Sequence, residues 1–359
     1  MTRRKIQLVG GSTYSVSLPK EWAETHGVEP GDEVSLHAHI DGSLVVATCT
    51  CGGANGVPDQ FTFEIDGHNV DELTQLMNAA YAAGVGRVTF VADEELSTTQ
   101  RRAIAEAASE LTGVTVHNET DNVIRANTPL DPEEISIRQS VRHLSFVALS
   151  MHRNATAALF GETNPELVLD QRGQVTRLHA LVDRHFHRSL SRLAEVDALG
   201  ITREELFGLW VASRELEQVS DTAVTIAETA QHLDAPPKGP LAEDLRETAQ
   251  TARECVETAT TAVIEEADLG ALQRSIADSE RVNTAVTTLD SRVLEKGVSN
   301  PRLIRAIDAI KRTSGHGTAI AETGLRGFVS RCEYTTDGSS AGGTRDNTKQ
   351  FAGSESDYT

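Results

Sequence analysis

The sequence predicts a multidomain fold with an N-terminal β domain, a small α/β middle domain and a C-terminal all-α region. Three observations lead to this prediction. The chain has 359 residues, more than twice the usual length of one domain. Its first 50 residues read as short strands around turns, and the residues up to 128 alternate strand with helix. Long amphipathic helical patterns fill most of the remainder.

Charge and composition narrow the classes of protein to which this chain can belong. It has 53 Asp and Glu against 33 Lys and Arg, which gives a net charge of −20, and only six of the basic residues are Lys. Fixed negative charge keeps a protein solvated at very high salt, so we expect a halophilic protein. An ordinary acidic cytosolic protein is the alternative. Aromatic residues make up only 4%, which argues against a platform that stacks single-stranded bases.

The sequence also bears on the cellular compartment. No segment approaches the roughly 18 apolar residues of a membrane span, and the start of the chain lacks the apolar core of a signal peptide. Four cysteines are too few for a disulfide scaffold in a chain of this length. We therefore expect a cytoplasmic protein.

The first block, residues 1–50, contains two turn signals. A Pro-Gly-Asp turn occurs at 30–32, and an Asp-Gly pair at 41–42 predicts a hairpin with a two-residue loop. The glycine-rich stretch 51–56 predicts a linker to the next domain.

The second block, residues 58–128, predicts a small α/β domain. Its expected strands are 61–65, 85–91, 114–116 and 123–126, and its expected helices are 70–83 and 97–111. No glycine-rich loop leads from a strand into a helix here, so the pattern offers no phosphate cradle. We assign no chemistry to this domain.

Beyond residue 131 the pattern is helical for about 200 residues. Asp131 and Pro132 are typical of the N-cap and first position of a helix. Breaks near 161–165, 200–202, 235–237, 268–270 and 297–301 leave six long helices. Helices joined by short turns pack antiparallel, so we expect a bundle.

The helical region is predicted to be two three-helix repeats, at 131–235 and 238–333, followed by a disordered tail at 335–359. Segments 216–228 and 310–322 follow one template, and both end in Ile-Ala-Glu. A shared signature in the third helix of each half indicates duplication.

At these residues the chain resembles the PhoU family of phosphate-uptake regulators, archaeal type, over about residues 133–332. Family members are tandem three-helix bundles with a Glu-x-x-x-Asp motif, which Glu217 and Asp221 match. The resemblance implies a bundle that reports phosphate status, either through contact with the ATPase subunit of the phosphate ABC transporter or through metal-dependent assembly. In the family such motifs are associated with bound metal clusters. In the second copy Lys311 and Gly315 replace the two acids, so a second such site is not expected.

The spacing of the two acids supports a metal site on physical grounds as well. Glu217 and Asp221 are four residues apart, so both carboxylates project from one helix face. Two hard oxygen donors on one face can bind a divalent or ferric cation, or they can form a solvated acidic surface.

A second candidate group lies on the preceding predicted helix. His179, Asp183 and His187 share one face there, and Asp183 is a further candidate metal ligand. Arg184 and Arg188 lie alongside, which favours the alternative that this face is an exposed stripe.

Positive charge is concentrated at the start of the chain. Arg3, Arg4, Lys5 and Lys20 precede the first acidic residue, Glu21. In a chain of net charge −20, such a block has the sign needed for contacts with DNA phosphates.

The order of elements at 3–48 resembles the AbrB/SpoVT (MazE-like) swapped-hairpin DNA-binding domains. The matching pieces are the basic strand 3–7, Ser-Val-Ser-Leu-Pro-Lys-Glu-Trp at 15–22, Gly-Val-Glu-Pro-Gly-Asp-Glu-Val at 27–34 and Gly-Ser-Leu at 42–44. The resemblance implies an obligate homodimer whose interleaved hairpins present one basic face to double-stranded DNA. Ser12 and Thr13, in the loop after the first strand, can donate hydrogen bonds to phosphate oxygens.

Together these features predict a phosphate-responsive transcriptional regulator. One alternative is a PhoU-like regulator of the transporter that acts by protein contact alone, with the N-terminal domain serving only for dimerisation. Another is a metal-binding or metal-sensing bundle. The sequence shows no nucleophile–base arrangement and no cofactor loop, so we do not expect an enzyme.

Overall fold

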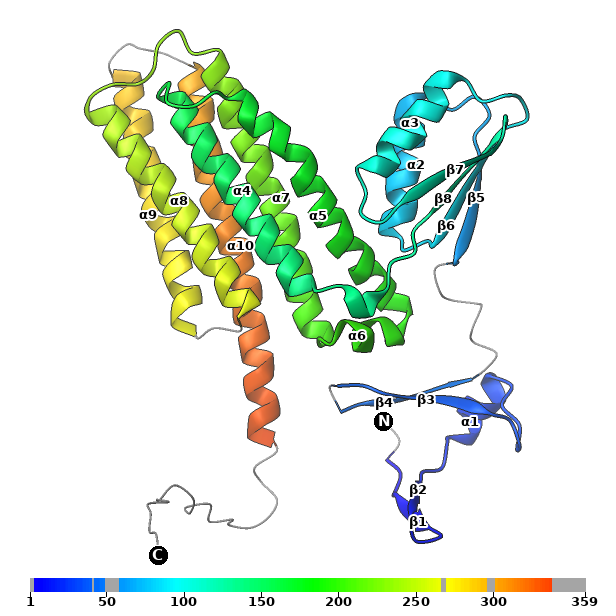
Figure 1. Cartoon of the computed structure of the whole chain (residues 1–359). Coiled ribbons are helices and arrows are strands. Elements are labelled where there is room, and N and C mark those ends of the chain that lie inside the picture. Colours follow the sequence, from blue (N-terminus) through cyan, green and yellow to red (C-terminus); the bar gives the residue numbers. More distant parts are fainter. Residues whose placement is uncertain (1–2, 41, 49–57, 266–268, 296–300, 338–359) are drawn as a thin grey trace, which may run out of the picture.

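The computed structural model describes residues 3–40, 42–48, 58–265, 269–295 and 301–337. It contains a pair of small hairpins at the N-terminus, an α/β domain and a bundle of long helices (Figure 1). This arrangement confirms the fold class that the sequence predicts.

The N-terminal block forms two separate two-stranded antiparallel sheets (Figure 1). Its elements are β1 (Gln7–Val9), β2 (Thr13–Ser15), α1 (Lys20–Thr25), β3 (Val34–Ala38) and β4 (Leu44–Thr48). β1 pairs with β2, and β3 pairs with β4. The two hairpins therefore do not form a common sheet within the chain.

The predicted Pro-Gly-Asp turn is confirmed, and its residues explain its shape. Gly31 has a φ of +106°, a conformation that favours glycine. The Asp32 carboxylate accepts a hydrogen bond from the Glu29 N–H at 2.8 Å, and the Asp32 N–H donates to the Glu29 carbonyl at 3.1 Å. This turn sets the direction in which the chain enters β3.

The predicted two-residue hairpin loop between β3 and β4 is wrong by one residue. Ala38 lies opposite Leu44, and the His39 N–H donates to the Ser43 carbonyl at 2.9 Å. The two strands therefore pair one residue away from the register that a two-residue loop at 41–42 requires. Gly42 has a φ of +82°, a conformation that favours glycine, and Asp41 lies outside the described residues.

The α/β domain is a four-stranded sheet in the order β5-β6-β8-β7 with two helices packed on it (Figure 1). Its elements are β5 (Gln60–Glu64), α2 (Val70–Ala82), β6 (Arg87–Val91), α3 (Thr98–Ser109), β7 (Thr115–Thr120) and β8 (Val123–Asn127). β5 and β6 are parallel, and the other pairs are antiparallel. A capping box begins each helix, built on Asn69 and on Ser97, as the predicted start at residue 97 requires.

Within the described residues, six long helices form the bundle, as predicted. The first three are α4 (Ile137–Leu159), α5 (Glu166–Ser191) and α7 (Arg203–Gln231), and the last three are α8 (Pro240–Ile264), α9 (Leu269–Glu295) and α10 (Pro301–Asp337). A short helix that the sequence pattern did not indicate, α6 (Leu193–Leu199), joins α5 to α7. Gly200 ends it in the left-handed conformation, with a φ of +66°.

One hydrophobic core runs through both three-helix repeats. α7 packs against α4 and α5 of its own repeat and against α10 of the other. Between α7 and α10 the Thr222 and Thr313 hydroxyls, both buried, form a hydrogen bond at 2.8 Å. The repeats are therefore joined by a packed interface, through which a change in one can reach the other.

The predicted start of the first long helix is wrong. Asp131 caps only a single 3₁₀ turn, Pro132–Glu134. α4 begins at Ile137, where the Ser136 hydroxyl accepts a hydrogen bond from the Gln139 N–H at 3.3 Å. Asp and Ser are both strong N-cap residues, so the local pattern alone does not choose between them.

The last helix is longer than the sequence predicts. α10 extends through Asp337, so the tail expected at 335–359 begins inside a helix, and 338–359 lie outside the described residues. In Figure 1 the C-terminal end of α10 projects beyond the other helices of the bundle. Among the described helices, none is long and apolar enough to cross a membrane.

Candidate nucleic-acid interface and acidic cluster

The predicted cations of the N-terminal block all lie at the surface. Arg3, Arg4 and Lys5 lead into β1, are exposed, and make no ion pair with any residue that the structure describes. Lys20 begins α1, and its Nζ lies 3.4 Å from Glu24 Oε1. An exposed pair of this kind contributes less than about 1 kcal/mol, so it leaves the Lys20 ammonium able to exchange partners. We call these four basic residues the cationic patch.

Ser12 and Thr13 lie at the other end of the first hairpin. Ser12 is in the turn, Thr13 is the first residue of β2, and both are exposed. The length of β1 separates this loop from Arg3, Arg4 and Lys5. A single chain therefore does not bring the two predicted groups of DNA-binding residues together.

The N-terminal block also exposes an unusual amount of apolar surface. Every residue from 3 to 18 is exposed, although the sequence places a run of apolar residues there. The exposed apolar side chains are Ile6, Leu8, Val9, Tyr14, Val16, Leu18, Leu36, Ile40 and Leu44. Contiguous exposed apolar surface in a protein marks an interaction site.

Among the predicted metal ligands, Glu217 is close to a histidine of the neighbouring helix. His179 Nε2 lies 3.5 Å from Glu217 Oε2, and the other ring nitrogen lies 3.0 Å from the Ser213 hydroxyl. Burial raises the pKa of the Glu217 carboxyl, and the nearby charges of Asp221 and Asp183 add to this, against the opposing effect of His179. The site thus concentrates negative charge at the contact of α5 with α7.

The other two predicted ligands are held by different partners. Asp221 Oδ1 lies 3.1 Å from Arg172 Nη2. Asp183 Oδ1 accepts a hydrogen bond from the Trp210 indole at 2.7 Å and lies 3.4 Å from His187 Nε2. Within the part of the chain that the structure describes, no group of three or more His, Cys, Asp or Glu side chains is arranged to hold a metal ion. Each carboxylate has a partner in the protein, and metal binding here stays a prediction.

The comparisons with known proteins bear on both ends of the molecule. Residues 7–48 match the family model described as "Antidote-toxin recognition MazE, bacterial antitoxin". The crystal structure of PhoU from Pseudomonas aeruginosa is similar to this chain with a TM-score of 0.48 and 17% sequence identity, covering 54% of this chain and 96% of that chain. No curated protein compared with the chain matches it. We refer to residues 7–48 as the MazE-like domain.

Sequence reasoning missed a buried basic junction between the α/β domain and α5. Arg184 is only 1% exposed, and its Nη1 donates to the carbonyls of Tyr81 at 2.8 Å and Val85 at 3.1 Å. Tyr81 is in the last turn of α2, and its carbonyl also accepts a hydrogen bond from the Gly84 N–H at 2.9 Å, whereas Val85 follows the helix. Burial lowers the pKa of Arg184 to about 10, so the side chain remains a cation at neutral pH. The exposed stripe predicted for this face of α5 is therefore wrong at Arg184.

α6 contributes the carboxylate at the centre of this junction. Glu195 is buried and lies 2.6 Å from His185 Nδ1 and 2.9 Å from Arg188 Nε. Arg188 also donates to the Gly84 carbonyl of the α/β domain at 3.2 Å. Burial acts to raise the pKa of Glu195, but the hydrogen bonds from His185 and Arg188 outweigh it and hold the pKa below its usual value.

The same short helix contacts the MazE-like domain. His39, at the end of β3, is buried, and its Nδ1 lies 2.9 Å from Asp197 Oδ1 of α6. Arg203, at the start of α7, lies 3.4 Å from the other ring nitrogen of His39. α6 therefore contacts the MazE-like domain through Asp197 and the base of the bundle through Glu195.

Proposed function

We propose that this protein is a phosphate-responsive transcriptional regulator that binds double-stranded DNA as a homodimer through its MazE-like domain. The observation that carries the proposal is the cationic patch. Four exposed basic residues lie within the first 20 residues of a chain whose net charge is −20. Three of them have no ion-pair partner among the described residues. A duplex carries dense negative charge that such a patch can neutralise.

The exposed apolar side chains of the MazE-like domain support dimerisation. A second copy of the same domain can cover them, which removes apolar surface from water at about 25 cal/mol per Å². A two-fold dimer presents two cationic patches, which suits a DNA site with two half-sites. In a cytoplasm of high salt, counterion release contributes less to affinity, so base-edge contacts and this two-fold geometry carry more of the binding.

The contacts of α6 support a route from the helical bundle to the DNA-binding end. Glu195 is fixed by α5, and Asp197 is fixed by His39 of the MazE-like domain. A shift of α5 against α7 that moves α6 therefore displaces the base of β3. Coupling of this kind needs two arrangements of the junction with different affinities for the effector.

The phosphate effector rests on the resemblance of the helical repeats to the PhoU family. That resemblance also supports contact with the ATPase subunit of the phosphate transporter as a further partner. The duplicated segments 216–228 and 310–322 occupy α7 and α10, which pack against each other between the repeats.

Sequencing of DNA bound to the protein in cells at high and low phosphate tests the proposal. We expect occupancy at promoters of phosphate-uptake genes that changes with phosphate. Equal occupancy at both levels would contradict the phosphate response. Absence of bound promoters would favour the alternative in which the MazE-like domain only dimerises a transport regulator.

A further inference from the structure

A groove on the surface of the bundle joins the two repeats and carries an exposed aromatic ring. It lies between α4 of the first repeat and α8 of the second and has a volume of about 260 Å³. Leu149 and Ile264, which line it, are buried. Phe146 also lines it and is 71% exposed, more than any other large apolar residue that the structure describes in the repeats. A large apolar side chain exposed beside a groove is typical of an interaction site.

Four charged residues line the same groove, and their signs are sorted by helix. Arg142 and Arg153 belong to α4, whereas Glu257 and Glu265 belong to α8. All four are exposed. Two positive and two negative charges cancel, so the groove as a whole does not favour a small ion of either sign. It instead presents a positive edge beside a negative edge, with the exposed ring between them.

The two helices are antiparallel at this groove. Arg142 of α4 lies 3.7 Å from Glu265 of α8 near one end. Toward the other end, His152 Nδ1 of α4 lies 3.3 Å from Arg253 Nη1 of α8. Residue numbers therefore rise along α4 in the direction in which they fall along α8.

This arrangement gives each end of the groove one arginine and one glutamate. Arg142 and Glu265 occupy one end as an exposed pair, and such pairs exchange partners easily. Glu257 lies nearer to Arg153 than to Arg142 along the antiparallel helices. Neither Arg153 nor Glu257 makes an ion pair with a residue that the structure describes. The charges of this second end are therefore available to a partner.

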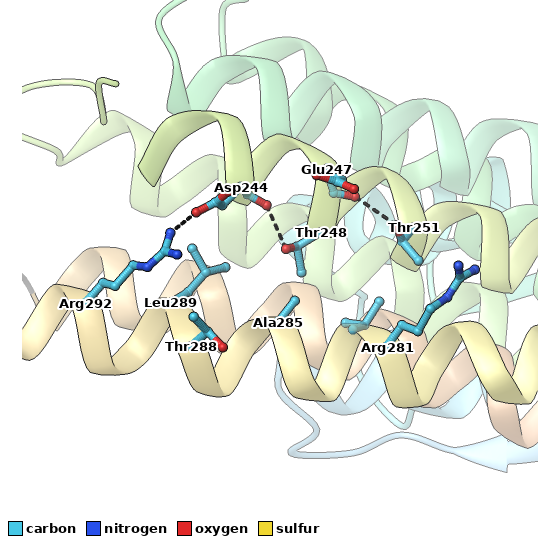
Figure 2. Close-up of a pocket in the computed structure, with 10 residues that line it drawn as sticks. Asp244, Glu247, Thr248, Thr251, Arg281, Ala285, Thr288, Leu289 and Arg292 are labelled. Carbon is cyan, nitrogen blue, oxygen red and sulfur yellow. Dashed lines mark hydrogen bonds and ion pairs between the residues drawn. The ribbon is translucent and has the colours of Figure 1, made fainter. Parts of the chain in front are cut away.

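The groove between α8 and α9 provides the contrast. It has a volume of about 300 Å³, but none of the exposed large apolar residues in the described part of the chain lines it. Figure 2 shows Arg292 directed at Asp244 across this groove. Arg281 pairs with Asp278 of its own helix. This groove therefore lacks both the exposed ring and the unpaired arginine of the first.

We propose that the groove between α4 and α8 is an interface with a second copy of this chain, related by a two-fold axis that runs along the groove. Rotation about this axis places α4 of each copy over α8 of the other and leaves each end of the groove at the same end. The arginines of α4 then face the glutamates of the other copy's α8. A two-fold axis across the groove would instead place α4 over α4, with arginine near arginine. Charge complementarity thus selects the axis along the groove.

The same rotation places the exposed ring of Phe146 over α8 of the other copy. Thr261 and Ile264 line the groove from α8 and form the surface that receives the ring. Burial of the two symmetry-related rings removes apolar surface from water. The arginines and glutamates then surround an apolar centre with a polar rim, which is the usual arrangement of a protein–protein interface.

This interface goes beyond the proposed function, because it needs neither DNA nor phosphate. It lies at the end of the bundle that meets the MazE-like domain. Arg138, one turn before Arg142 on α4, lies 2.5 Å from Glu205 in the first turn of α7. Arg203 of that turn lies 3.4 Å from His39 of the MazE-like domain. One two-fold axis can therefore relate both the bundles and the MazE-like domains of a dimer.

Selective pairing of two charge variants of the full-length protein tests this inference. The homodimer of Arg153→Glu places glutamate against glutamate, and the homodimer of Glu257→Arg places arginine against arginine. A mixed dimer restores opposite charges at every such contact. Native mass spectrometry of an equilibrated mixture, with one variant isotopically labelled, measures the pairing. We expect the exchange constant for mixed dimers to exceed its statistical value at least tenfold, since like charges across an interface are unfavourable.

A matched pair in the other groove gives the control. Arg281→Glu and Glu247→Arg, at residues labelled in Figure 2, should pair at random. Phe146→Ser changes an exposed residue, so it should keep the circular dichroism of the parent protein and raise the dissociation constant of the dimer at least tenfold.

Two outcomes would overturn the inference. One is a chain that stays monomeric at all concentrations. The other is random pairing of Arg153→Glu with Glu257→Arg in a protein that dimerises, which would place the dimer contact in the MazE-like domain alone and leave Phe146 to a different partner. Preferred mixed dimers in a protein that does not bind DNA would contradict the proposed function alone.

Discussion

The MazE-like domain and the helical repeats differ in how much of their apolar surface is buried, and how many of their charges are paired, within one chain. The repeats bury a continuous apolar core, and many of their charged side chains are paired, as Asp221 is with Arg172. The MazE-like domain leaves Leu8, Val16 and Leu36 exposed, and Arg3, Arg4 and Lys5 just before it have no ion-pair partner among the described residues.

This difference indicates where partners are needed. Exposed apolar surface is typical of a protein-binding site, and unpaired cations are typical of a site that binds an anion. The N-terminal end shows both features at once. Under the proposed function, a second copy and a nucleic acid cover this end, whereas the bundle already buries a continuous core of its own.

The largest expected effect concerns the proposed dimer interface of the MazE-like domain. Changing Val16 and Leu18 to Asp places charge on the exposed apolar surface. The dissociation constant of the dimer should therefore rise at least a hundredfold. Light scattering over a concentration series measures this. Leu190→Asp, at a residue of α5 that is 67% exposed, is the control and should leave the oligomer unchanged. A double variant that stays dimeric at the parent protein's concentrations would show that these residues are not in the interface.

A smaller effect is expected at the junction between the α/β domain and α5. Arg184→Met removes the donor from two buried carbonyls and should lower the free energy of unfolding by roughly 3 kcal/mol. Arg177 of the same helix is exposed and reaches the carbonyls of Ser109 and Glu110 only at 3.3 and 3.4 Å. Arg177→Met should therefore cost less than about 1 kcal/mol. Equal costs in denaturant titrations would mean that burial of Arg184 does not stabilise the junction.

The smallest effect concerns the pH dependence of α6. The pKa of Glu195 is held below its ordinary value of 4.5, so its ionised form stabilises the folded state above that pH. Compared with Glu195→Gln, the parent protein should have an advantage of order 1 kcal/mol that is constant from pH 7 to about 5. The advantage should disappear as the pH falls further and the carboxylate is protonated.

Exposed Glu106, whose carboxylate pairs with Arg102 on the surface of α3, gives the matched control. Glu106→Gln should show a much smaller difference from the parent protein across the same pH range. A Glu195→Gln difference that stays constant down to the acid-unfolding limit would show that the Glu195 carboxylate is not stabilised by His185 and Arg188.

Local signals determined how much of the fold could be predicted. The turn at Gly31 and Asp32 and the helix start at Ser97 depend on residues within a few positions, and both were predicted correctly. The register of β3 with β4 differs by one residue from the predicted one, because an Asp-Gly sequence occurs in hairpin loops of more than one length. The cations of the patch could be named from charge alone, since little else competes with it in the first 20 residues.

Contacts between domains could not be read from the same signals. Arg184 and His179 belong to the same predicted helix. In the structure the α/β domain buries Arg184, whereas His179 faces α7. Periodicity indicates which residues share a face and not which domain covers it. For the same reason the contacts of Glu195 with His185 and Arg188, which depend on how α6 packs on α5, were not predicted.

The salt dependence of binding to duplex DNA tests the role of the cationic patch most directly. The variant in which Arg3, Arg4 and Lys5 become Ser is compared with one in which Arg274, Arg281 and Arg312, exposed on α9 and α10, become Ser. If all three cations of each copy contact phosphates, the slope of log affinity against log salt should fall by up to about 5 in the first variant, with affinity largely lost. The second variant has the same change in net charge and should keep the slope of the parent protein. Equal slopes and affinities in the two variants would contradict the account, because they would show that the N-terminal cations do not meet the DNA.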